Sequence, residues 1–128
     1  SPETVRKQKF DDQRVQQLQQ ISYAVQSYVN AQTVDLAKLP PDLKALYASP
    51  YYSQPVNDPE TGKLYEYSPG SDLNYQLCAT FDTMTSVADS GNVMPAPVPY
   101  GGYNNQFWNH PAGRHCFALN ATNPPKLK

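Results

Sequence analysis

The chain has 128 residues, 13 of them Pro and 10 Tyr, and its net charge is −1 with only 16% charged residues. This length fits a single domain with one modest core. The near-balance of charges argues against nucleic-acid binding and against a polybasic membrane patch, since both depend on a basic excess.

Residues 1–32 are predicted to form one long helix. Ser1, Pro2 and Glu3 are typical of a helix start. Further along, apolar residues recur every three or four positions and predict the stripe of an amphipathic helix. They are Val15, Leu18, Ile21, Val25, Tyr28 and Val29. The part before Arg14 has too few apolar residues for such a stripe, so we expect it to project from the globular body.

Residues 39–48 follow, where Pro40 and Pro41 break the chain and a short helix is expected. The segment from Asp58 to Gly62 has the composition of a tight turn, with an Asp, a Pro and a Gly at suitable positions.

Residues 64–81 predict a β-hairpin. Its first strand spans Leu64 to Tyr67, and the turn lies at Ser68 to Asp72. The second strand, Asn74 to Phe81, alternates strictly between apolar and other residues. Its first face carries Tyr75, Leu77, Ala79 and Phe81. The other face carries Gln76, Cys78 and Thr80.

Residues 82–128 are expected to form a long loop, from Asp82 to Gln106, and then a last short strand from His115 to Leu119. The whole chain thus predicts a single α+β domain.

The two cysteines, Cys78 and Cys116, show neither CxxC nor zinc-ligand spacing. A structural disulfide between them is the favoured interpretation, and it would indicate an exported protein. The alternative, a nucleophilic Cys116 assisted by His115, is disfavoured because neighbours on a strand point to opposite faces.

Three stretches carry a family resemblance: residues 12–28, residues 39–46, and residues 58–67 with 75–79. Their order and spacing resemble the soluble part of a type IV pilin-like protein or pseudopilin, over about residues 5–81. The resemblance implies a long helix packed on a small antiparallel sheet. It also implies a structural or assembly role in a secretion or pilus-type envelope system.

The same resemblance implies a location for the protein and a mode of contact. The domain would be periplasmic or extracellular, anchored to the inner membrane through an N-terminal segment removed from this chain. Its contacts would be protein partners or self-assembly through the N-terminal helix, with no nucleic acid and no cofactor.

An aromatic set in the Gly/Pro-rich loops offers an alternative function. Tyr100, Tyr103, Phe107 and Trp108 could bind a glycan or a peptide, or they could simply cover a small core. Weaker candidates are Asp82, Asp89 and Asn92, whose oxygens on a flexible loop suit Ca²⁺; such a calcium is also a feature of major pseudopilins. Ordinary loop polarity explains the same residues.

No catalytic motif is present: the chain has no Gly-x-Ser-x-Gly elbow, Walker loop, GxGxxG or HExxH. The stretch from Trp108 to Cys116 holds both histidines, but a metal site would need further ligands nearby. We therefore expect neither a catalytic residue nor an enzyme.

Overall fold

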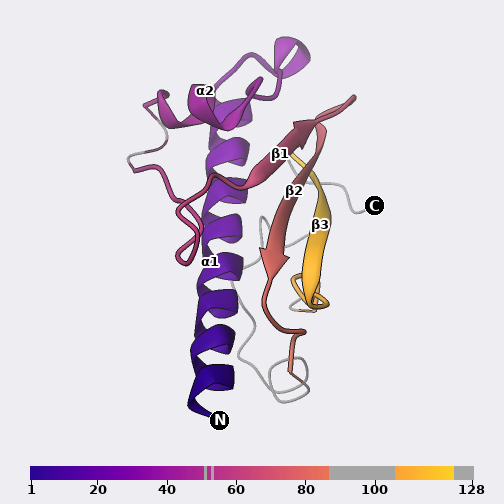
Figure 1. The fold of residues 1–128 in the computed structure, drawn as a ribbon. Helices are drawn as coiled ribbons and strands as arrows, with labels where there is room; N and C mark the ends of the chain where they lie inside the picture. Colours follow the sequence, from indigo (N-terminus) through magenta and orange to yellow (C-terminus); the bar gives the residue numbers. More distant parts are fainter. Residues whose placement is uncertain (51, 53, 87–105, 123–128) are drawn as a thin grey trace.

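The computed structural model describes residues 1–50, 52, 54–86 and 106–122. The long helix α1 (Pro2–Asn30) runs along the molecule, and a three-stranded antiparallel sheet lies beside it (Figure 1). The 3-10 turn η1 (Val34–Leu36) and the short helix α2 (Leu43–Tyr47) follow α1. This arrangement confirms the α+β class and the packing of a long helix on a small sheet.

Helix α1 begins where its sequence predicts. The Ser1 side chain accepts a hydrogen bond from the Thr4 backbone N–H at 3.2 Å, and Pro2 occupies the first turn, where its missing N–H costs nothing. The apolar stripe faces the sheet, and its buried members are Leu18, Ile21, Ala24, Val25 and Val29.

The projecting part of α1 is shorter than predicted. Residues 1–6 are exposed, but burial begins at Asp11 rather than at Arg14. The reason is that Asp11 accepts hydrogen bonds from the segment that follows the second strand, so the helix is held one turn earlier than its apolar stripe indicates.

The sheet has the strand order β1-β2-β3. Strand β2 (Asn74–Phe81) is central, and one of the two faces predicted by its alternation is buried in the core: Tyr75, Leu77, Ala79 and Phe81 are each at most 4% exposed. Strand β3 (Gly113–Asn120) pairs with the whole of β2 and is therefore longer than the predicted strand from His115 to Leu119.

Strand β1 (Glu66–Pro69) starts two residues later than predicted. The turn to β2 lies correspondingly further along, with Asp72 and Leu73 at positive φ (56° and 64°) and Asn74 donating its N–H to Ser71 O at 3.0 Å. Pro69 is tolerated because β1 is an edge strand.

The predicted disulfide is confirmed. Cys78 and Cys116 are directly opposite each other on β2 and β3, with their Cα atoms 4.0 Å apart. The bridge fastens the last strand to the hairpin across 38 residues of sequence. It lies on the outer side of the sheet, near the exposed ion pair between Arg114 and Glu66.

Helix α2 falls inside the predicted segment 39–48. The Asp42 side chain accepts from the Ala45 N–H at 2.7 Å and caps the helix, while Leu43 and Leu46 are buried in the core. Tyr67 on β1 donates its hydroxyl to Pro40 O at 2.7 Å, which ties this region to the sheet.

Candidate functional site

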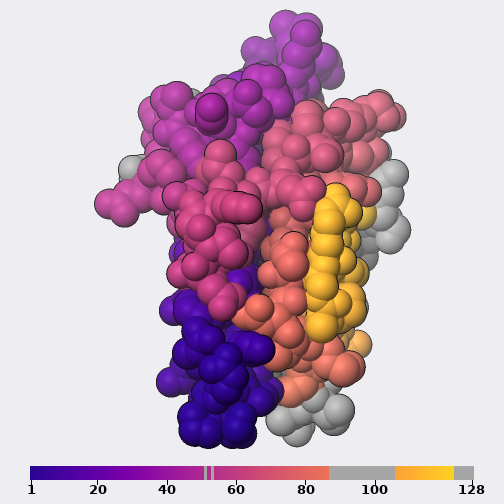
Figure 2. All heavy atoms as spheres, viewed as in Figure 1, coloured from indigo at the N-terminus to yellow at the C-terminus, as the bar shows by residue number. Residues whose placement is uncertain are grey.

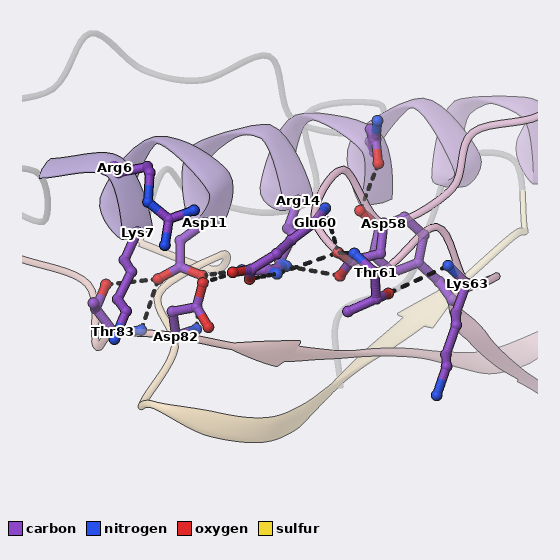
Figure 3. Close-up of polar contacts among 12 residues, drawn as sticks. Arg6, Lys7, Asp11, Arg14, Asp58, Glu60, Thr61, Lys63, Asp82 and Thr83 are labelled. Atoms are coloured by element: carbon purple, nitrogen blue, oxygen red, sulfur yellow. Dashed lines mark hydrogen bonds and ion pairs between the residues drawn. The ribbon is translucent and has the colours of Figure 1, made fainter. Parts of the chain in front are cut away.

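The most concentrated polar chemistry in the described residues surrounds Arg14 of α1. This side chain is only 2% exposed, although arginine is seldom buried without partners. Arg14 and four acidic residues form what we call the Arg14 cluster: Asp11, Arg14, Asp58, Glu60 and Asp82. Figure 3 shows the guanidinium reaching from the helix to acids on two other segments.

The guanidinium of Arg14 uses all of its donors. Nε and Nη2 donate to the two oxygens of Asp58 at 2.7 and 3.2 Å, and Nη2 also donates to Glu60 at 2.7 Å. Nη1 donates to Asp11 at 2.8 Å and to Asp82 at 3.1 Å. A guanidinium has five N–H groups, so each one has an acceptor.

Asp11 connects the cluster to the chain after β2. Its carboxylate accepts the backbone N–H groups of Asp82 and Thr83 at 2.9 and 2.8 Å, and the Thr83 hydroxyl at 2.6 Å. The segment leaving the sheet is therefore fastened to the N-terminal third of α1.

Asp58 organises the turn on the other side. Its Oδ1 accepts the backbone N–H groups of Glu60 and Thr61, both at 2.9 Å, while Gly62 closes the turn at φ +76°. The Asp-Pro-x-x-Gly turn expected from the sequence therefore serves to present a carboxylate to Arg14.

The electrostatics of the cluster favour the ionised forms of Arg14, Asp58 and Asp82. Burial disfavours the charge of Arg14, but the hydrogen bonds to Asp58, Glu60, Asp82 and Asp11 outweigh it and raise the pKa of Arg14. Burial likewise opposes ionisation of Asp58, yet the hydrogen bonds from Arg14 and the turn backbone lower its pKa. The pKa of Asp82 is lowered by contact with Glu60 and Arg14, against the effect of burial.

The cluster is suited to positioning rather than to chemistry on a substrate. It holds α1 against two loops that are far apart in the sequence. No group of three or more His, Cys, Asp or Glu side chains suited to a metal ion occurs in the part of the chain that the structure describes. Of the three calcium candidates, Asp82 pairs with Arg14, whereas Asp89 and Asn92 lie outside the described residues.

Of the four aromatic candidates, two lie among the described residues and two lie outside them. Trp108 is 4% exposed and packs on Phe117, with ring centroids 4.9 Å apart, so it belongs to the core. Phe107 is half-buried against the same core, and Tyr100 and Tyr103 lie outside the described residues. The two described members thus take the core-covering role that the sequence left open.

Both histidines of the stretch from Trp108 to Cys116 pack against aromatic rings. His110 stacks on Phe81 with ring centroids 3.6 Å apart, and His115 meets the Phe117 ring edge-on. Burial lowers the pKa of each histidine. Cys116 is bonded to Cys78, so it offers no free thiol.

Sequence reasoning missed the Arg14 cluster, although a signal for it was present. Arg14 stands four and seven residues before Leu18 and Ile21, so it shares their helix face. Asp11 lies one turn earlier on that face. Charged residues that continue an apolar stripe point to buried ion pairs, but their partners, 44 to 68 residues away, cannot be identified from the stripe.

Comparisons with known proteins identified no relative of this chain. No protein-family model matches the chain, and no curated protein or solved structure shows significant similarity to it. In the described part of the chain, none of the helices combines the length and the apolar character that crossing a bilayer requires.

Proposed function

We propose that this chain is the extracytoplasmic domain of a pilin-like, membrane-anchored protein with a structural or assembly role in a secretion or pilus-type envelope system. The observation that carries the proposal is the form of α1. Its first turns extend past the ends of the strands, whereas its later turns pack along the sheet (Figure 1). A helix used in this way can continue into an anchor or contact a neighbouring subunit while the sheet holds its other half.

The Arg14 cluster supports this proposal because it fixes the direction of the helix. The ion pairs form at the point where α1 leaves the body, between the exposed turns and the apolar stripe. Loads applied to the exposed turns would reach the sheet through these buried contacts. A structural subunit needs such a rigid junction.

The disulfide supports the proposed location. Disulfides persist in oxidising compartments such as the periplasm or the cell exterior. Here the bridge joins β3 to β2, and β2 is the strand that packs on α1.

The proposal is tested by photo-crosslinking of the full-length protein in its native membrane. A photo-reactive amino acid replaces Val5 on the exposed part of α1, which is 50% exposed. Leu64, 46% exposed and outside the helix, is the matched control. We expect cross-links to a second copy or to another envelope subunit from position 5 and none from position 64.

Two outcomes would contradict the proposal. The first is equal cross-linking from both positions, because contacts would then not depend on the helix. The second is a gene whose sequence upstream of Ser1 encodes only a cleavable export signal. A pilin-like anchor requires about 20 apolar residues joined directly to α1.

A further inference from the structure

A groove of about 540 Å³ lies between the middle of α1 and the chain that connects α2 to β1. The helix contributes Gln20, Tyr23 and Ser27, which share one face because they are spaced by three and four residues. The opposite wall is formed by Tyr52, Gln54 and Val56. Figure 1 shows this connecting chain running beside α1.

The two walls come from uncharged stretches of sequence. Residues 15–34 and residues 45–57 contain no Asp, Glu, Lys or Arg. A charged group placed in the groove would therefore meet no counter-charge among the lining residues. This chemistry selects for a neutral occupant.

The walls combine apolar surface with amide groups that make no hydrogen bond to another side chain or backbone group among the described residues. The amides of Gln20 and Gln54 each offer donors and an acceptor, and neither bonds to another described residue. The Tyr52 hydroxyl is buried without a partner among the residues described, so an occupant cannot reach it unless the wall moves, and Tyr52 contributes its position in the wall rather than a hydrogen bond. The Tyr23 ring adds a flat apolar face with a polar tip.

We propose that this groove binds a neutral saccharide. A sugar ring carries many hydroxyls for the glutamine amides and an apolar C–H face for a tyrosine ring, and it brings no charge. The volume lies within the roughly 300–1,000 Å³ of small-molecule sites. The ligand class is one that the sequence suggested for the loops around Tyr100–Trp108, but the groove places it at a different site.

This site goes beyond the proposed structural role and is independent of it. Its residues come from the middle of α1, whereas the assembly contact is expected at Val5, near the exposed end. A subunit of an envelope assembly could therefore carry both the assembly contact and the saccharide groove, and an experiment can refute either proposal without refuting the other.

The test is titration of the isotope-labelled, disulfide-bonded chain with three neutral probes, followed in amide nitrogen–proton NMR spectra. The probes are maltotriose, cellotriose and triacetylchitotriose, and trigalacturonate serves as the charged comparison. We expect at least one neutral probe to shift signals of the groove residues, including the side-chain amides of Gln20 and Gln54. The charged probe, trigalacturonate, should not shift the signals of the groove residues.

Matched variants make the result specific to the groove. Replacing both exposed glutamines (Gln20→Ala with Gln54→Ala) should weaken binding about tenfold or more, since each loses a hydrogen bond. Gln16→Ala is the control, because Gln16 is an exposed glutamine of the same helix that does not line the groove. It should bind as the parent does.

Three results would overturn the proposal. They are the absence of shifts with all three neutral probes, unchanged affinity in the double variant, and groove shifts that appear on raising the protein concentration without sugar. The last would mean that a second copy of the chain occupies the groove.

Discussion

Replacing Arg14 by methionine would remove the cation that all four acids of the Arg14 cluster contact, while keeping an unbranched, though shorter, side chain. Asp11 and Asp58 are only 2% and 8% exposed, so both would be left buried without that counter-charge. Breaking a buried ion pair in this way costs about 3–5 kcal/mol.

That cost is a large part of the stability of such a domain. At about 0.05–0.15 kcal/mol per residue, a chain of this length has a free energy of unfolding of roughly 6–19 kcal/mol. We expect Arg14→Met to lower the free energy of unfolding by about 3–5 kcal/mol, which corresponds to a melting temperature lower by about 10–20 °C. The free energy of unfolding of Arg14→Lys should lie between those of the parent and of Arg14→Met, because lysine keeps the charge but cannot supply five donors in a fixed plane.

The assay is urea unfolding of the disulfide-bonded protein followed by circular dichroism, because urea is uncharged and does not screen ion pairs. Arg6→Met is the matched control. Arg6 belongs to the same helix, is about half exposed, and among the described residues it forms its ion pair with Glu3. Equal midpoints for Arg14→Met and Arg6→Met would refute the view that the cluster holds α1 in place.

The pH dependence provides a second check on the same cluster. The pKa values of Asp58 and Asp82 are lowered by folding, so their contribution to stability is present above the unfolded pKa of about 4. It is lost as the pH falls through the folded values. The stability difference between the parent and Arg14→Met should therefore be largest near neutral pH and shrink below about pH 4.

Three further predictions concern the sheet and its aromatic cover. Replacing Cys78 and Cys116 together by alanine should lower the free energy of unfolding, measured in urea, by about 4 kcal/mol, because the unfolded chain gains entropy without the cross-link. Two free thiols in the unreduced parent would contradict the bridge. Trp108→Ala should cost about 3–5 kcal/mol, and the fluorescence of this single Trp should shift to the red on unfolding. A spectrum already red in the folded protein would refute its burial. The pKa of His110, followed by NMR, should lie below the usual 6.5 because burial lowers it. Its contribution to stability is therefore complete above that pH and is lost as the pH falls through the lowered pKa. A normal or raised pKa would contradict its buried position against the Phe81 ring.

Local patterns were sufficient to predict the main elements. A capped start and an apolar repeat of three and four positions determine α1, because helix geometry puts those residues on one face. Strict alternation determines which residues of β2 share a face in the same way. The limits of β1 were misplaced by two residues, since the turn depends on Asp72 and Leu73 adopting positive φ, for which neither is a strong indicator.

Tertiary structure decided the features that join distant segments. The sequence by itself determined the apolar stripe of α1, the residues of β2 that share a face, and that two cysteines were available to pair. Only the fold placed Asp58 and Asp82 beside Arg14, moved Trp108 into the core and brought two uncharged stretches together as a groove. The physical reason is that a periodic pattern reports the direction of a side chain, whereas its partner depends on how the rest of the chain packs.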